Sequence, residues 1–573
     1  MPVFTGTPGN DTITGGPGPD TLIGLTGDDS YFVDDPGDQV VEAAGEGWDI
    51  VYVSGNPTGI ATYVLTAGSH VEVLGTINNF GTALINLTGN ELDNYITGNA
   101  VTNWLTGGGG QDILWGRGGN DFYFVDTNDI VVEYAGDGDA DMCVVAVSYQ
   151  LPSNVEILVT DDSTGTAALG LYGNELDNSI LGNAGANTLD GGAGADILDG
   201  FGGPDRLLGR TGDDSFYVDD INDQTVEALG EGNDIVYARI SYALSAGASI
   251  ETLRPAEAIA TTALTLIGNE LANTIYGNDG ANLLDGGGGG DTLIGARGND
   301  SYYVEGGDII VETGNQGNDI AYARGDFTLN AGADVETLGT IDNFATTAIN
   351  LTGNDGANYI TGNAGANVID GGGSNAIDTL WGRGGDDTYY VEGGDIIIEY
   401  AGDGTDIVYA RGGGYHLNAG AHVEVVAAAN SASTTASLLS GNEFANTVIG
   451  SAGANTINGR GGADTLQGLG GADTFAFTTE LGSGNVDQIV DFVSGADKIA
   501  LENAIFTGLA AGALPAGAFV TGTAAQDAND RIIYDNTTGQ IYFDADGNGS
   551  GAAILFATLG AGTALASTDF TVI

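Results

Sequence analysis

The sequence is poor in the residues that most functional sites need. Its 573 residues include one cysteine, three histidines and 12 basic side chains, against 78 acidic ones, so the formal net charge is −66. A single cysteine, Cys143, excludes an internal disulfide framework and a cysteine-based zinc site. So few cations cannot form the basic surface that nucleic acids require. No apolar run approaches the roughly 18 residues needed to cross a membrane. We therefore expect no nucleic-acid partner and no membrane insertion.

Sequence signatures of an enzyme are also missing. There is no His-Glu-x-x-His motif and no Gly-x-Ser-x-Gly motif, and His70 and His422 occupy matching places in two repeated segments. Repeats begin at Gly6, so we expect no separate catalytic domain before them. The N-terminus shows no apolar signal segment. We expect a protein that is not an enzyme.

Glycine, by contrast, is abundant, with 99 residues, and recurs with a period of nine. Residues 89–124 divide into GNELDNYIT, GNAVTNWLT, GGGGQDILW and GRGGNDFYF, each with Asp or Asn in the sixth place and an apolar residue in the eighth. Such short strands between tight turns must stack on one another to bury their apolar residues. We predict an all-β fold, a parallel β-solenoid of tandem modules. Its core comes from the eighth place, for example Ile13, Leu22, Leu105, Leu114, Leu198 and Leu293.

A longer period contains the short one. A Gly-x-Asp motif that closes each block of nonapeptides recurs at intervals of 86 to 93 residues. We divide the chain into an N-terminal repeat block (1–33), five modules (34–126, 127–219, 220–305, 306–392 and 393–478) and a C-terminal segment (479–573). Each module also carries degenerate coils and a glutamate between apolar residues. These glutamates, which we interpret as a structural or ligating ladder, are Glu72, Glu156, Glu251, Glu336 and Glu424.

The pattern Gly-Gly-x-Gly-x-Asp points to a cation. Glycine reaches the backbone conformations that a turn of about six residues needs, and the turn directs carbonyl oxygens toward the aspartate. Oxygen ligands without His or Cys favour calcium or magnesium, and a large flexible cage favours calcium. Coils stack about 4.8 Å apart, so their carboxylates would repel strongly without a dication. The alternative is that Asp and Asn serve only as turn formers.

The nonapeptide resembles that of the repeats-in-toxin (RTX), or hemolysin-type calcium-binding, proteins, most clearly in residues 107–115 and 191–199. This resemblance implies a right-handed β-roll with calcium bound between turns. It implies that the sixth-place aspartates are ligands: Asp11, Asp20, Asp29, Asp112, Asp121, Asp196, Asp205, Asp214, Asp291, Asp300, Asp378, Asp387, Asp464 and Asp473. We extend the metal site to Gly107, Gly110, Gly191 and Gly194 and to the aspartates of the degenerate coils: Asp38, Asp49, Asp129, Asp223, Asp234, Asp308, Asp319, Asp395 and Asp406.

The opening units of later blocks depart from this pattern, because asparagine replaces aspartate in the sixth place. These residues are Asn94, Asn103, Asn178, Asn187, Asn273, Asn282, Asn358, Asn367, Asn446 and Asn455. Two interpretations stay open: the amide oxygens bind calcium, or the asparagines form an uncharged ladder that needs no metal. We hypothesise that calcium clusters near the end of each block.

The C-terminal segment is similar to the terminal cap and secretion domain of RTX proteins exported by type I systems. Its strand-like runs would close the open end of the solenoid, and its ending, residues 569–573, is acidic and hydrophobic like an uncleaved export signal. The resemblance implies a chain that stays unfolded at cytosolic calcium and folds in the millimolar calcium outside.

Together these features predict a secreted, calcium-binding structural protein that assembles with itself at the cell surface as an S-layer, filament or matrix. Expected partners are copies of the chain and the type I machinery, with surface polysaccharide as a further candidate. A calcium-dependent adhesin or polysaccharide-binding protein is the alternative, with Trp104, Trp115 and Trp381 as contact candidates; a polysaccharide-modifying enzyme is a weaker one. The recurring Arg239, Arg324 and Arg411 pair either with nearby carboxylates or with a neighbouring molecule.

Overall fold

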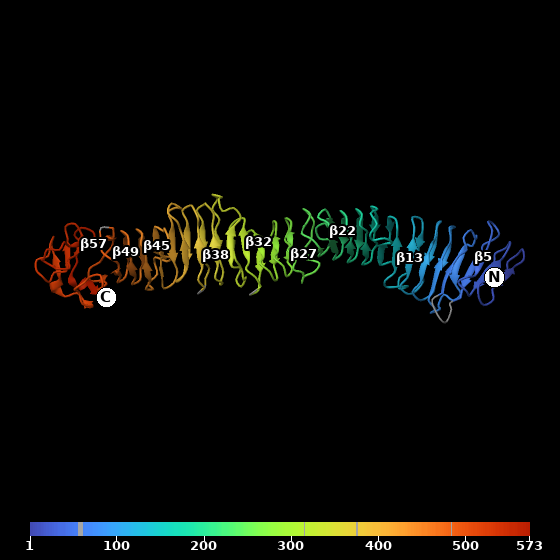
Figure 1. Ribbon diagram of the computed structural model, residues 1–573, viewed down its shortest axis with the longest axis horizontal. Helices are drawn as coiled ribbons and strands as arrows, with labels where there is room; N and C mark the ends of the chain where they lie inside the picture. The colour runs from blue at the N-terminus through green and yellow to red at the C-terminus, as the bar shows by residue number, and fades with distance from the viewer. Residues whose placement is uncertain (55–60, 315, 374–375, 483) are drawn as a thin grey trace. The chain divides into compact units, whose positions relative to one another are not determined.

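The computed structural model describes residues 1–54, 61–314, 316–373, 376–482 and 484–573. Its described part is all-β (Figure 1), and the helical elements there are two single 3₁₀ turns, η1 (Ala516–Ala518) and η2 (Ser567–Asp569). No helix within these ranges has the length and apolar character to cross a membrane. The predicted all-β class is confirmed.

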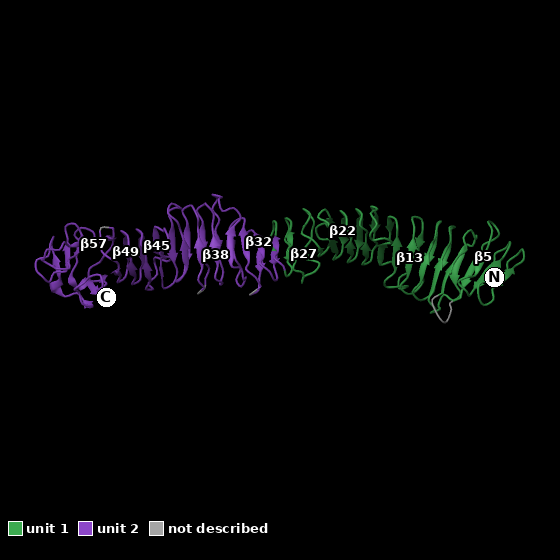
Figure 2. Cartoon of the chain, viewed as in Figure 1, with its two compact units in different colours: residues 1–279, 286–291 green, residues 280–285, 292–573 purple. Residues whose placement is uncertain are grey.

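The chain forms two compact units, which Figure 2 shows in green and purple. Unit 1 contains residues 1–279 and 286–291, and unit 2 contains residues 280–285 and 292–573. Each unit is a stack of short parallel strands wound into successive coils. The predicted parallel β-solenoid is therefore confirmed.

Two nonapeptides make one turn of the solenoid. Tyr95 in β10 (Tyr95–Thr97) lies beside Ile113 in β12 (Ile113–Trp115), 18 residues later. Between them in sequence, β11 (Trp104–Thr106) pairs in parallel with β13 (Phe122–Val125) in another sheet. Alternate nonapeptides thus supply strands to the two sides of the coil. The first of these sheets in unit 1 contains β2 (Thr12–Thr14), β4 (Ser30–Val33), β6 (Ile50–Val53), β8 (Val73–Thr76), β10, β12 and β14 (Ile130–Val131).

The core runs along the inside of each stack. The predicted core leucines of the eighth place, Leu22, Leu105, Leu114, Leu198 and Leu293, have no exposed surface, and Ile13 is 6% exposed. Burying a side chain of this size contributes about 1.5–3 kcal/mol. Because the same place is filled in coil after coil, each turn depends on its neighbours for stability.

The end of unit 2 follows a different pattern. β51 (Asp487–Ile489) and β52 (Lys498–Leu501) extend the parallel ladders, and they pair with β57 (Ile554–Thr558) and β58 (Phe570–Val572). β55 (Ile532–Asp535), β56 (Gln540–Phe543) and β57 are antiparallel. The final residues thus lie against the last coils, and Asp569 accepts hydrogen bonds from Ser494 and Gly495. Their role in export stays a prediction.

Candidate calcium sites

The structure buries the predicted aspartates. All those assigned from the sequence are buried except Asp11, which is half-buried. Asp112, Asp234 and Asp291 have no exposed surface at all. Burying a carboxylate is costly unless hydrogen bonds or a cation compensate its charge. The partners of each oxygen therefore decide what these side chains do.

One oxygen of most of these carboxylates continues a hydrogen-bonded ladder from coil to coil. Asp121 Oδ1 accepts the backbone N–H of Asn103 (2.6 Å), and Asp141 Oδ1 accepts that of Asp121 (2.7 Å). Glu156 ends the series by accepting the N–H of Asp141 (2.9 Å). The five glutamates predicted as a ladder all have this terminal role, since Glu72, Glu251, Glu336 and Glu424 accept the N–H of Asp49, Asp234, Asp319 and Asp406.

The second carboxylate oxygen, Oδ2, is not used by this ladder. Among the described residues, Oδ2 of several of these aspartates is buried and has no hydrogen-bond partner. They are Asp29, Asp49, Asp112, Asp121, Asp141, Asp196, Asp205, Asp214, Asp234, Asp300, Asp387, Asp406 and Asp464. Buried polar atoms without a partner are rare in folded proteins. A row of buried anionic oxygens is the donor set that a hard cation requires.

In five places this oxygen meets two further carboxylates. Where the first module meets the second, one oxygen each of Asp121, Glu133 and Asp141 lie within 4.8 Å of one another, and all three residues are buried. Tyr123 donates its hydroxyl to Glu133. We call each such group an acidic trio. The five trios are Asp29–Glu42–Asp49, Asp121–Glu133–Asp141, Asp214–Glu227–Asp234, Asp300–Glu312–Asp319 and Asp387–Glu399–Asp406.

The trios do not depend on the tyrosine. Tyr302 and Tyr389 donate to Glu312 and Glu399 as Tyr123 does to Glu133. In the third trio, however, the equivalent residue is Phe216, which is fully buried and has no hydroxyl. The three carboxylates persist there without it. The carboxylates, not the phenol, are therefore the constant feature of the site.

Burial makes these carboxylates hard to ionise in the absence of a cation. Desolvation, with a contribution from Asp121 and Asp141, raises the pKa of Glu133 to about 9. Desolvation likewise raises the pKa of Asp121 to about 8 and that of Asp141 to about 6. The pKa of Glu399 rises to about 9 for the same reason. A bound dication would remove this penalty, because it satisfies the oxygens and balances their charge.

Glycines give the trios the space they need. Gly116 lies so close to Asp121 Oδ2 and the Tyr123 hydroxyl that a Cβ there would clash with both. The predicted Gly107 and Gly191 lie in the same way against Asp112 and Asp196. Gly110 and Gly194 have left-handed φ values of +112° and +110°, as the tight turn requires.

Replacing Gly116 with alanine should therefore disrupt the second trio. We expect Gly116→Ala to lose one calcium ion per chain and to destabilise the protein by about 1–3 kcal/mol, as overpacking does. The matched control is Gly118→Ala two residues later, where a Cβ would meet nothing closer than 3.5 Å. Calcium counting by equilibrium dialysis and thermal unfolding in calcium measure both effects. Equal loss in the two variants would contradict the assignment.

The asparagine coils differ from the aspartate coils in their hydrogen bonds. Asn94 Oδ1 accepts the N–H of Asn90 (2.9 Å), and its Nδ2 donates to the carbonyl of Val71 (2.8 Å). Asn103 is bonded in the same way at both ends, to Asn99 and Ile85. These two amides complete their hydrogen bonds within the protein, whereas Oδ1 of Asn187 is buried and has no partner among the described residues. The geometry favours the uncharged ladder and supports clustering of calcium in the later coils of each block.

In the first degenerate coil after each block, the aspartate oxygens also accept hydrogen bonds from the backbone. Asp38 accepts the N–H of Asp20 at one oxygen and those of Asp34 and Asp35 at the other. The structure does not bring this set into a trio; its members are Asp38, Asp129, Asp223, Asp308 and Asp395. Their backbone bonds are those of turn formers. A calcium role for them, and for the sixth-place aspartates outside the trios, stays a prediction.

Six residues of the trios were not among those predicted from the sequence. One is Asp141. The segment GDGDAD that contains it has one residue more than the corresponding segment GEGWD that ends at Asp49, so Asp141 does not fit the expected spacing. The others are the central glutamates, Glu42, Glu133, Glu227, Glu312 and Glu399. A signal was present: each lies 12 or 13 residues after the first aspartate of its trio and 7 or 8 before the second.

The fold and the trios together define a class, a calcium-binding β-solenoid with carboxylates buried between its coils. The family model for the RTX calcium-binding nonapeptide repeat matches residues 5–35, 88–123, 172–207, 199–223, 267–302, 350–377, 373–395 and 440–475. The chain thus contains RTX calcium-binding nonapeptide repeats, and calcium is the ion that such repeats bind. No curated protein matches the chain.

Proposed function

We propose that this RTX protein is a secreted building unit that folds on calcium outside the cell and assembles with itself at the cell surface, without enzymatic activity. The observation that carries the proposal is the repetition of one calcium trio in five successive modules. RTX-repeat proteins are typically secreted. Repetition of one site from module to module suits a protein that presents a regular surface rather than a single reactive centre.

Calcium would also couple folding to export. A trio cannot exist in the unfolded chain, so the free energy of calcium binding adds to that of folding. At cytosolic calcium the chain would remain unfolded and could pass through a type I exporter. On reaching millimolar calcium outside the cell it would fold, and the folded chain could not return through the exporter.

Apolar loop tips offer a surface for self-association. Phe80, Ile259 and Phe344 are 86%, 84% and 88% exposed, and each lies in the loop that follows the strand after a ladder glutamate. Three loops at equivalent places in different modules thus each expose a large apolar residue. Repeated apolar contacts of this kind support ordered association between copies of the chain.

The recurring arginines bind within their own chain. Arg239, Arg324 and Arg411 each form a two-pronged bridge to an aspartate about 40 residues earlier, with closest contacts of 2.6, 2.6 and 2.5 Å to Asp199, Asp285 and Asp370. Local pairing is thus confirmed. The rival idea, that these arginines pair with a neighbouring molecule, stays a prediction that these bridges within the chain do not support.

The tryptophans considered as glycan contacts are also engaged. Arg117 lies over the ring of Trp115 at 3.7 Å, and Arg383 lies over that of Trp381 at 4.0 Å. Trp104 is 51% exposed and packs against Phe122. These three residues do not favour the adhesin alternative over assembly.

Electron microscopy of the purified chain tests the proposal. In millimolar calcium we expect sheets or fibres that disappear on chelation. A Phe80→Ser/Phe344→Ser variant should raise the concentration needed for assembly at least tenfold, because each tip loses its apolar contact. Leu229→Ser is the control, since Leu229 is 87% exposed in a different type of loop. Isolated particles at every concentration would contradict the proposal.

A further inference from the structure

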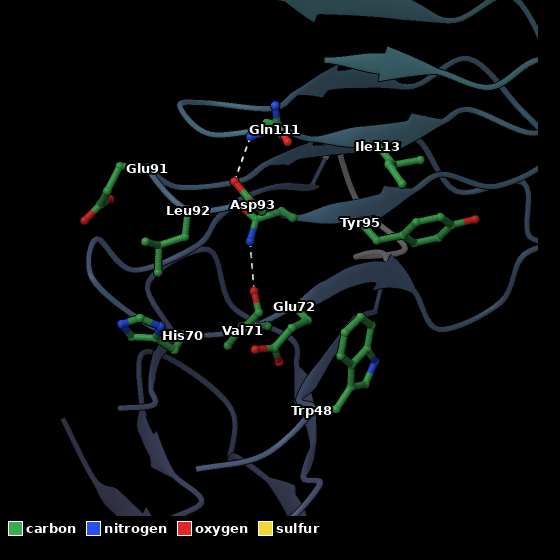
Figure 3. Close-up of a pocket in the computed structure, with 11 residues that line it drawn as sticks. Trp48, His70, Val71, Glu72, Glu91, Leu92, Asp93, Tyr95, Gln111 and Ile113 are labelled. Carbon is green, nitrogen blue, oxygen red and sulfur yellow. Dashed lines mark hydrogen bonds between the residues drawn. The ribbon is translucent and has the colours of Figure 1, made fainter. Parts of the chain in front are cut away.

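A cleft on unit 1 is separate from the trios. Its volume is about 580 Å³, within the range of about 300–1,000 Å³ typical of small-molecule sites. Figure 3 shows Trp48 and Tyr95 on one side of it and His70 with Glu91 on the other. Glu72 and Asp93 lie between them. Aromatic faces and carboxylates therefore line one hollow.

Four neighbouring coils place these side chains. Trp48 lies two residues before Ile50, and Ile50, Val73, Tyr95 and Ile113 are adjacent across β6, β8, β10 and β12. With coils about 4.8 Å apart, the cleft extends over about 14 Å. A linear chain of rings lying along the solenoid axis would fit this extended shape.

The polar groups of the cleft are held in place. Glu72 Oε2 accepts the N–H of Asp49, 2.8 Å away, so this side chain is fixed by a member of the first trio. Asp93 Oδ1 accepts the N–H of Gln111 (2.8 Å), as the dashed line in Figure 3 shows. In each carboxylate the second oxygen stays available for a donor. Trp48 is 58% exposed and presents its ring to solvent.

The chemistry of the lining selects the ligand. Among its eleven described residues are three carboxylates, Glu72, Glu91 and Asp93, and no lysine or arginine. An acidic ligand would be repelled. Carboxylates accept hydrogen bonds from hydroxyl or ammonium groups, and exposed aromatic rings pack against apolar faces. Pyranose rings carry both features, with hydroxyls at the rim and C–H groups on the face.

We propose that this cleft binds a glycan of non-acidic sugars, with Trp48 and Tyr95 as stacking surfaces and Glu72, Glu91 and Asp93 as hydroxyl acceptors. The second module does not repeat the aromatic residues of this site. In the second module, Asp177 corresponds to Asp93 and accepts the backbone N–H of Ala195 (2.8 Å). However, Ser179 replaces Tyr95 and Ala140 replaces Trp48 there. The proposal holds whether or not the chain assembles.

Titration of the full-length chain in 5 mM calcium with defined oligosaccharides tests the proposal, monitored by calorimetry. The probes are cellohexaose for neutral sugars, the glucosamine hexamer for cationic ones and hexagalacturonate for acidic ones. We expect binding of cellohexaose, the glucosamine hexamer or both, and none of hexagalacturonate. The tighter binder of the first two probes shows whether the cleft prefers a neutral or a cationic sugar. Binding of hexagalacturonate alone, or of none of the three at millimolar concentration, would overturn the proposal.

Two variants locate the binding. Trp48→Ala and Tyr95→Ala should each weaken it at least tenfold, while Trp104→Ala, which removes an exposed tryptophan outside the cleft, should leave it unchanged. Circular dichroism in calcium confirms that each variant is folded. An equal loss of glycan affinity in Trp104→Ala would contradict the assignment of binding to this cleft. A lysine-rich peptide that bound while neither non-acidic hexamer did would show a protein partner instead and overturn the glycan.

Discussion

Chelating calcium at pH 7.5 is expected to remove most of the β-sheet circular dichroism of this protein. Each trio places three carboxylate oxygens within 4.8 Å of one another in a buried site, and without the ion the folded chain must either protonate these carboxylates or bury uncompensated charge. An ion present at 1,000 times its dissociation constant stabilises the fold by about 4 kcal/mol. Five such sites contribute about 20 kcal/mol, more than the 5–15 kcal/mol that separates most folded domains from their unfolded state.

Re-adding the ion provides the control. Calcium at a few millimolar should restore the signal, and magnesium at the same concentration should restore much less, because magnesium requires a small, rigid octahedral site. The transition should be cooperative within a stack, since each coil supports the next. A chain that kept its β-sheet signal in excess chelator would show that calcium is not needed for the fold.

Protons are expected to replace calcium in part. Burial raises the pKa of Glu133 and of Glu399 to about 9 in the folded chain, against about 4.5 for an ordinary glutamate. A group with a raised folded pKa stabilises the fold at low pH, and that stabilisation is lost as pH rises through the folded value. Between about 4.5 and 9, each such group therefore costs about 1.4 kcal/mol of stability per pH unit gained.

The calcium-free chain should thus be more folded at pH 5 than at pH 8, which circular dichroism in chelator measures. With calcium present the trend reverses, because protons compete with the ion for the same oxygens. The control is Glu133→Gln/Glu399→Gln, which removes two of the titrating groups and should flatten the pH dependence of the calcium-free chain. Greater stability at pH 8 than at pH 5 without calcium would contradict the proposed state of the trios.

The fold could be predicted because its physical cause is local and repeated. The nine-residue period fixes the turns, and the eighth place, with Leu105 and Leu114 as examples, fills the core of every coil. The site could be predicted only in part. Asp121 lies within a regular repeat, but Glu133 lies in a degenerate coil, and only the folded stack brings the two together. Likewise, the partner of Arg411 is Asp370, two turns away, which no local pattern indicates.

The central claim is that calcium occupies the five acidic trios. Anomalous X-ray diffraction from crystals of the chain, grown in calcium and exchanged with terbium, tests it most directly. The claim predicts a strong anomalous peak between the carboxylates of each trio, including the third, where Phe216 replaces the tyrosine. Peaks confined to the asparagine coils, or trios without any peak, would contradict it.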